Sequence, residues 1–304
     1  PVAALATPLS IGRVDRDAIE LLGATHSSEA LNRVPGVMVQ RGSGQESLTA
    51  IRSPVLTGAG SCGAFLFLEN GVPIRPVGFC NVNEMLEINT EQADAIEILR
   101  GTGSALYGSN SVHGTINVLQ DAPPELPPWQ LGLGLGPDQY TRGSLVTAHT
   151  AETIGLGIKA LYTHDGGWRD DSGFDEGKLN ATLTTGAGGR IPSRFDLAAT
   201  KLEQQTAGFI LGENAYRDPD LRQQNLNPEA YRNASAVRLT GLVQPRTSLP
   251  GQLELRPYLR TSRMDFLQHF LLGQPVERNG QESAGVMTSF EWDLGDRAGL
   301  ITGL

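Results

Sequence analysis

From residue 129 onward the sequence repeats one pattern, in which segments of about ten residues alternate apolar and polar side chains and are separated by turn-forming residues. Leu179, Ala181 and Leu183, for example, alternate with polar residues. Alternation of this kind places apolar side chains on one face of a strand and polar side chains on the other. The pattern predicts nine strands, at residues 129–135, 140–150, 153–164, 176–185, 194–204, 232–243, 252–263, 282–293 and from 297 onward.

The connections between these predicted strands alternate between short turns and long polar loops, apart from the short first connection at 136–139. A soluble β-sandwich also alternates along its strands, but alternating connection lengths are typical of an outer-membrane β-barrel with short periplasmic turns and long extracellular loops. Phe290 and Trp292 lie beside a short turn, where an interfacial aromatic belt is expected. The short turns lie near 151–152, 186–192, 245–251 and 295–296, and the long loops cover 166–175, 206–231 and 265–281.

Composition agrees with a turn-rich β protein, since the 304 residues include 37 glycines and only 39% are hydrophobic. A net charge of -9 argues against nucleic acid as a partner, because a phosphate-binding face needs clustered Lys and Arg. No window is apolar enough for a transmembrane helix, and the start at Pro1 shows no signal peptide. The five histidines lack metal-ligand spacing and no nucleophile motif is found, so we expect no enzyme.

The chain before residue 122 has a mixed pattern that predicts a small α+β domain. An extended arm (1–10) precedes two short helices, at 15–22 and from 27 or 28 to 31. Four prolines at 122–128 predict a stiff linker to the strands at 129–304. Further strands are predicted near 37 and at 48–52, 65–68, 96–99 and 115–119, with a short helical piece at 104–107.

Four ordered motifs in this domain carry a family resemblance. Residues 96–119 read IEILRGTGSALYGSNSVHGTINVL, and upstream are LNRVPGVMV at 31–39, AIRS at 50–53 and LENGVPI at 68–74. Together they resemble the plug domain of TonB-dependent outer-membrane receptors. Ser53, Thr102 and His113 depart from the usual residues. A Gly-rich nucleotide loop fits poorly, because no Gly-Lys-Ser/Thr follows.

The resemblance implies a plug domain (1–121) followed by part of a transmembrane barrel. Barrels of this family close at about twenty-two strands, and an open edge in lipid is costly, so we expect this chain to be a fragment. The implied function is uptake of a scarce metal chelate, a ferric siderophore or a cobalamin-like compound, driven by a TonB-type periplasmic partner. The family's partner-contacting segment is not found here. An oligosaccharide receptor and a non-transporting adhesin or binding module remain alternatives.

Two plug loops are expected to reach the external side and bind the ligand. The first, at 53–63, is Gly-rich, and the second, at 75–83, offers charge, a stacking face and hydrogen bonds to an anionic chelate. Loop packing against the barrel is the alternative role. The candidate ligand-binding residues are Ser53, Thr57, Ser61, Arg75, Phe79 and Asn81.

In receptors of this family, arginines at the ends of two plug strands pair with acidic residues of the barrel wall. Arg52 and Arg100 hold those positions here, and Glu254 is the candidate partner on the inward face of its strand. Cys62 and Cys80 flank one turn, so we expect a disulfide in an oxidising compartment, with a metal pair or two free thiols as alternatives.

One long loop is rich in carboxylates, and calcium binds six to eight oxygen ligands in irregular geometry. Cobalamin receptors within the family order external loops with calcium, which supports a calcium site here. Asp218 or Asp220 from the next long loop would help, whereas a solvated acidic loop partly neutralised by Arg169 is the alternative. The candidate ligands are Asp165, Asp170, Asp171 and Asp175.

Overall fold

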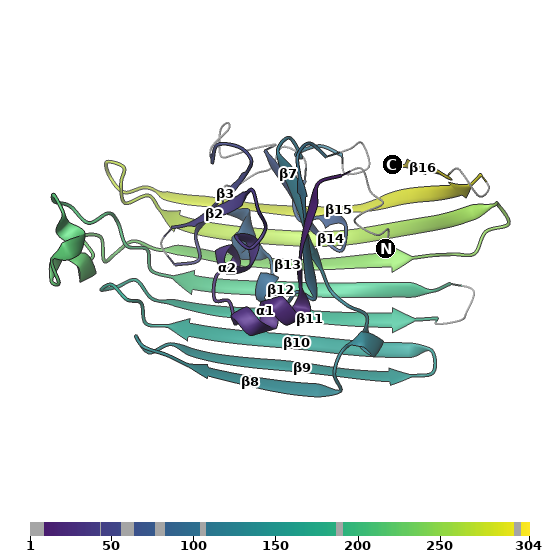
Figure 1. Cartoon of the computed structure of the whole chain (residues 1–304), viewed down its shortest axis with the longest axis horizontal. Coiled ribbons are helices and arrows are strands. Elements are labelled where there is room, and N and C mark those ends of the chain that lie inside the picture. Colours follow the sequence, from purple (N-terminus) through teal and green to yellow (C-terminus); the bar gives the residue numbers. More distant parts are fainter. Residues whose placement is uncertain are drawn as a thin grey trace.

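The computed structural model describes residues 9–42, 44–55, 64–76, 83–103, 108–186, 191–294 and 299–304. It consists of a small α+β domain, called the plug below, that lies against one face of a nine-stranded sheet, called the large sheet (Figure 1). No helix within the described residues has the length and apolar character to cross a membrane.

The plug is built on a five-stranded mixed sheet in the order β1-β6-β7-β4-β5. Its neighbouring strands are antiparallel except β4 and β7, which are parallel. β1 was not predicted from the sequence, because its five residues adjoin the first helix and show no strict alternation. The strands are β1 (Ile11–Asp15), β4 (Phe65–Glu69), β5 (Val72–Pro73), β6 (Ala95–Arg100) and β7 (Gly114–Leu119).

Short helices and one separate hairpin complete the plug. The two predicted helices are present, and the predicted helical piece at 104–107 lies outside the described residues. The core lies between the sheet and the helices, where Ile96, Ile98, Ile116 and Val118 are fully buried. The helices are α1 (Arg16–Leu22), α2 (Ser27–Leu31) and the 3-10 turns η3 (Glu84–Glu87) and η4 (Thr90–Gln92), and the hairpin pairs β2 (Val37–Arg41) with β3 (Ser47–Ile51).

The nine predicted segments form one antiparallel sheet, in which each strand pairs with its neighbours in sequence. A 3-10 turn, η5 (Pro123–Glu125), lies in the Pro-rich segment before it. The strands are β8 (Trp129–Leu135), β9 (Thr141–Ala151), β10 (Ile154–Asp165), β11 (Phe174–Thr185), β12 (Ser193–Gln204), β13 (Arg232–Val243), β14 (Gly251–Leu267), β15 (Val276–Asp293) and β16 (Gly299–Gly303).

The third long loop is shorter than predicted. The pairing of β14 with β15 continues to Leu267 and Val276, so the connection covers only residues 268–275 instead of 265–281. Both strand ends are rich in polar residues, and backbone hydrogen bonding across the pair does not depend on the polarity of the side chains. Polarity alone therefore misplaced the ends of these two strands.

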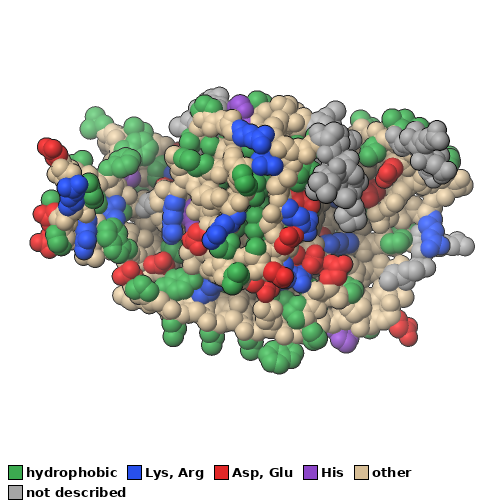
Figure 2. All heavy atoms as spheres, viewed as in Figure 1, with side chains coloured by type: hydrophobic (Ala, Val, Ile, Leu, Met, Phe, Trp, Pro, Cys, Tyr) green, Lys and Arg blue, Asp and Glu red, His purple; other side chains and the backbone are tan. Residues whose placement is uncertain are grey.

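The two faces of the large sheet differ in the way that the alternation predicts. Lys178, Asn180 and Thr182 face the plug and are buried. Leu133 and Leu135, on the other face, are 94% and 84% exposed, and Figure 2 shows hydrophobic side chains projecting along the edge of the molecule beside β8. An apolar outward face is what a sheet in contact with lipid requires.

Candidate functional site: the contact between plug and large sheet

Cationic side chains of the large sheet meet carboxylates of the plug across their contact. Since side chains alternate along a strand, every second residue of β10–β13 points toward the plug. Figure 2 shows acidic side chains gathered where the plug meets the sheet. Among the residues that the structure describes, the ion pairs between the two parts are Lys159 with Asp94, Lys178 with Glu91, Arg232 with Glu46 and Arg238 with Glu69.

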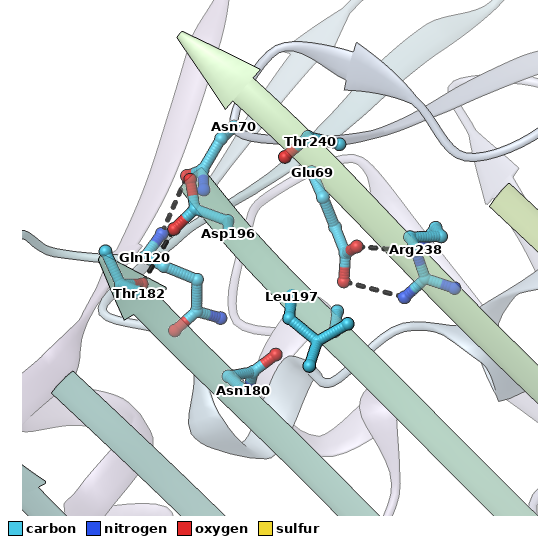
Figure 3. Close-up of a pocket in the computed structure, with 10 residues that line it drawn as sticks. Glu69, Asn70, Gln120, Asn180, Thr182, Asp196, Leu197, Arg238 and Thr240 are labelled. Atoms are coloured by element: carbon cyan, nitrogen blue, oxygen red, sulfur yellow. Dashed lines mark hydrogen bonds and ion pairs between the residues drawn. The ribbon is translucent and has the colours of Figure 1, made fainter. Parts of the chain in front are cut away.

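Arg238 on β13 and Glu69 at the end of β4 form the most completely buried arginine pair between the two parts (Figure 3). Two nitrogens of the guanidinium donate to the two carboxylate oxygens at 2.6 and 2.9 Å, and one also donates to the carbonyl of Glu87 at 2.6 Å. The side chains are only 3% and 9% exposed. A buried ion pair is tolerated when additional hydrogen bonds satisfy it, and its loss leaves an unpaired buried charge.

Lys178 on β11 lies between two carboxylates. Its ammonium nitrogen is 2.7 Å from Glu91 of the plug and 3.1 Å from Glu176 of its own strand, and all three side chains are 3% exposed. Burial alone would raise the pKa of Glu91, but the adjacent Lys178 holds that pKa below its ordinary value. Glu91 is therefore a charged partner that keeps the plug on β11.

Asp94 is a meeting point of three parts of the chain. Its carboxylate accepts from the ammonium of Lys159 on β10, from the guanidinium of Arg16 on α1 at 2.7 Å, and from the backbone N–H of Asp121 at 2.6 Å. Lys159 also donates to the carbonyl of Gln92 at 3.0 Å. This one carboxylate therefore links α1, the segment that follows β7, and strand β10 of the large sheet.

The short turns η3 and η4 carry the central plug contacts with the sheet. The amide of Asn89, between the turns, donates to Asn180 of β11 at 2.9 Å and accepts from the hydroxyl of Thr200 of β12 at 2.6 Å. Leu86 of η3 packs into a small apolar cluster otherwise made by the sheet, which consists of Phe174, Leu202, Ala234 and Met264. Polar and apolar contacts therefore hold the same twelve-residue region, 83–94, on β10–β14.

The structure places the predicted ligand-binding residues as follows. Arg75 is buried and its guanidinium pairs with the carboxylate of Glu87, so its charge is used inside the plug. The hydroxyl of Ser53 donates to the carbonyl of Pro54 at 3.0 Å. Roles of these residues in ligand binding stay predictions. Thr57, Ser61, Phe79, Asn81 and both cysteines of the predicted disulfide, Cys62 and Cys80, lie outside the described residues.

The predicted lock between Arg52, Arg100 and Glu254 differs from the pairs in the structure. Arg100 donates to the carbonyl of Pro35 within the plug at 2.8 Å. The backbone N–H of Arg52 donates to the carbonyl of Gly36, and Glu254 pairs with Arg256 of its own strand at 2.9 Å. Among the described residues the Arg100 side chain thus hydrogen-bonds within the plug and Glu254 pairs within its own strand, and a pairing of Arg52 or Arg100 with Glu254 stays a prediction.

In the ion pairs named above between plug and sheet, the cation lies on the sheet and the carboxylate lies on the plug. The predicted pairing had the arginine on the plug and the carboxylate on the barrel wall. Sequence reasoning missed these residues, although one signal was available. Lys159, Lys178 and Arg238 occupy inward positions of strands whose alternation was correctly predicted. A charge at such a position needs a partner on the plug.

Two of the predicted calcium ligands, Asp165 and Asp175, have other partners for their carboxylates. Asp165 accepts from the backbone N–H of Gly167 at 2.8 Å, and Asp175 accepts from the hydroxyl of Tyr162 and lies 2.9 Å from a ring nitrogen of His164. Within the described part of the chain, no three His, Cys, Asp or Glu side chains are grouped as a metal site. Calcium binding by Asp165, Asp170, Asp171 and Asp175 would need a rearranged loop and stays a prediction.

Comparison with known proteins agrees with this architecture. The family model "TonB-dependent Receptor Plug Domain" matches residues 3–115. The vitamin B12 transporter BtuB of Photobacterium profundum is 27% identical over 199 residues, which are 62% of this chain and 31% of that protein. The chain therefore spans about a third of the length of this curated relative.

Two solved structures show the same fold. The ferric citrate transporter FecA in its unliganded form has a TM-score of 0.78 at 17% identity, over 98% of this chain and 46% of that one. The ferric yersiniabactin uptake receptor FyuA of Yersinia pestis has a TM-score of 0.71 at 15% identity, over 95% and 46%. The chain therefore carries the plug domain of TonB-dependent receptors at residues 3–115 and has the fold of these outer-membrane receptors, a plug with part of a β-barrel.

Proposed function

We propose that the whole receptor imports a metal chelate, either a ferric siderophore or a cobalamin-like compound, with energy from a TonB-type periplasmic partner. The observation that carries this proposal is the plug held on the inward face of the sheet by buried ion pairs. A domain seated in this way blocks the inside of a barrel. Passage of a ligand therefore requires work on the plug, which an energised partner would supply.

The names of the relatives support the choice of ligand class. They are a vitamin B12 transporter, a ferric citrate transporter and a ferric yersiniabactin uptake receptor, so each handles a metal complex.

Uptake assays in cells test this function. Cells that produce the full-length receptor are given radiolabelled cyanocobalamin or ferric citrate, with and without a protonophore, beside cells that lack the receptor. We expect receptor-dependent accumulation of one of these chelates that stops when the proton-motive force is dissipated. Accumulation that is insensitive to the protonophore, or cell adhesion without accumulation of either chelate, would contradict the proposal.

A further inference from the structure

The cations of the large sheet that contact the plug and form ion pairs are of two kinds. Among the described residues, the first kind pairs with plug carboxylates alone, whereas the second kind has a carboxylate on its own strand, two positions away. Residues two positions apart on a strand point to the same face, so both members of such a pair face the plug. The first kind consists of Lys159, Arg232 and Arg238, and the second of Lys178, Arg194 and Arg256.

The two kinds differ in what they lose when the plug moves away. Arg194 pairs with Asp196 at 2.8 Å and donates to the plug carbonyl of Gln120 at 2.6 Å. Arg256 pairs with Glu254 at 2.9 Å and likewise donates to a plug carbonyl. Each of these arginines loses a carbonyl and keeps its carboxylate. A cation of the first kind is instead left without the carboxylate that pairs with it.

Lys178 belongs to the second kind and is buried between carboxyl groups of both parts of the chain. Its ammonium donates to Glu91 of the plug at 2.7 Å. Oε1 of Glu176, on its own strand, lies 3.1 Å away without the geometry of a hydrogen bond. The better-placed partner therefore leaves with the plug, and the other stays on the sheet. Because a buried cation without a partner is costly, Lys178 has a reason to turn to Glu176 when Glu91 leaves.

The nearest further cation is held elsewhere. Arg142 of β9 lies in the same cross-strand row as Glu176, with Thr163 of β10 between them. Two strand spacings place the backbones of these two residues about 10 Å apart. The guanidinium of Arg142 donates to two plug carbonyls. Lys178 is therefore the cation that both glutamates share.

We propose that Glu176 is a reserve partner, which takes over Lys178 when residues 88–94 of the plug separate from β11, so that this contact is released before the contact at Arg238. In the proposed uptake, the plug would loosen at η4 while the pair of Arg238 and Glu69 still holds it. That role rests on the proposed function, whereas the competition of Glu91 and Glu176 for Lys178 does not.

Amide hydrogen exchange in the full-length receptor measures this release. The backbone N–H groups of Gln92 and Ala93 donate to the carbonyls of Asn89 and Thr90 at 3.3 Å. Exchange of these two amides reports the equilibrium constant for local opening of η4, called the opening constant below. Opening of η4 carries Glu91 away from the sheet, so the opening constant depends on what Lys178 finds in its place.

A double-variant cycle tests the competition. We expect Glu91→Gln alone to raise the opening constant less than about fivefold, because Glu176 keeps Lys178 paired. In the background of Glu176→Gln, the same substitution should raise the opening constant at least about tenfold more, because Lys178 is then buried without a carboxylate. Equal effects of Glu91→Gln in the two backgrounds overturn the reserve role.

The single variant Glu176→Gln decides the matter even if the double variant does not fold. The closed plug still pairs Glu91 with Lys178, but the opened plug leaves Lys178 alone, so the opening constant should fall at least about threefold. An unchanged or higher opening constant overturns the proposal. Glu203→Gln, at a 59% exposed glutamate of β12, is the matched control and should stay within about twofold of the wild type.

The order of release is tested at Glu69, the plug partner of Arg238. The amide of Asn70 donates to the carbonyl of Val118 at 2.9 Å and reports opening beside Glu69. Glu69→Gln should raise opening there at least about tenfold more than Glu91→Gln raises the opening constant of η4. An equal or smaller rise overturns the order. No chelate enters these measurements, so a receptor that imports none makes only the proposed uptake wrong.

Discussion

Strands β11–β13 and strands β8–β9 face the same plug with different side chains. The first group presents Lys178, Thr200 and Arg238, and each of these contacts a buried group of the plug. The second presents Gly132, Gly134 and Ser144 around a cavity of about 450 Å³, and Arg142 of β9 donates to the plug carbonyls of Gly23 and Ala24. The plug is therefore held unevenly, with buried ion pairs at β11–β13, called the fastened side, and a cavity beside β8–β9, called the hollow side.

The proposed uptake requires a plug that stays folded and can still be displaced, and an uneven contact meets both requirements. Burial of matched charges and of Leu86 keeps residues 83–94 in register with the sheet. The following four predictions test this comparison, in order of decreasing effect.

The largest effect is expected from Arg238→Met on the fastened side. The substitution leaves the carboxylate of Glu69 buried without its cation, which typically costs about 3–5 kcal/mol. Amide hydrogen exchange of η3 measures the local free energy of opening. The double variant Arg238→Met, Glu69→Leu should recover most of the loss, because a hydrophobic pair of similar volume is often neutral.

The exposed pair Lys201 and Glu203, whose side chains are 73% and 59% exposed, is the control for this measurement. Lys201→Met should leave the exchange of η3 unchanged. The buried pair would not fasten the plug if Arg238→Met and Lys201→Met lowered the local free energy of opening of η3 by similar amounts. No recovery in the double variant Arg238→Met, Glu69→Leu would show the same.

Leu86→Ala should have the second-largest effect on the local free energy of opening. Its side chain is buried in the cluster with Phe174 and Leu202, so truncation removes transfer free energy and opens a cavity, at a cost of about 3 kcal/mol. Faster exchange in η3 and η4 with unchanged exchange in β6 is the expected result. Leu21, 89% exposed on α1, supplies the matched control Leu21→Ala, for which no comparable change is expected.

His26 gives the third prediction, on pH dependence. Burial, with a smaller contribution from Arg41, lowers the pKa of His26 from 6.5 to about 4. One ring nitrogen accepts from the backbone N–H of Ser28 at 3.1 Å, and the other lies 3.0 Å from the carbonyl of Glu46, whose side chain pairs with Arg232. The neutral ring therefore caps α2 beside the fastened side.

The pKa of His26 is lower in the folded protein than in the unfolded chain. The stabilising contribution of its neutral ring is therefore complete above pH 6.5 and is lost as the pH falls toward 4. Between pH 7.5 and 5.0 the loss should be roughly 2 kcal/mol. Exchange of the α2 amides at the two pH values, corrected for intrinsic rates, measures it. A His26→Gln variant should lose this pH dependence, and its persistence there would assign the effect to another group.

The smallest effect is expected on the hollow side. Ser144→Ala removes a hydroxyl from the cavity wall, and the change in stability should stay within about 0.5 kcal/mol. Exchange of the plug amides and of the neighbouring β9 amides checks this. A loss comparable to that of Leu86→Ala would mean that the two sides are not different.

Much of the fold could be predicted from the sequence because the relevant signals are local. Alternation with a period of two identified all nine strands of the large sheet, and the motif at 96–119 identified the plug. β1 was missed because five residues next to a helix carry too short a pattern. The ends of β14 and β15 were misplaced because polar residues continue into the paired backbone.

The candidate site was predicted less well, for a different reason. Partners in the contact lie far apart in the chain, with Lys159 and Asp94 separated by 65 residues and Arg238 and Glu69 by 169. A strand-end arginine such as Arg100 has local carbonyls within reach, and the sequence does not show which acceptor is nearer. The sequence therefore could not show that Arg100 hydrogen-bonds within the plug, and its pairing with the barrel wall stays a prediction.

The sequence by itself determined which side chains of each strand point inward, since the direction of a side chain follows from its position in the alternation. It also determined that glycines, not charges, line β8. Only the tertiary structure decided which plug carboxylate meets which cation and that the glycines of β8 face a cavity. Those outcomes depend on the seating of the plug against the sheet, which joins residues that no local pattern relates.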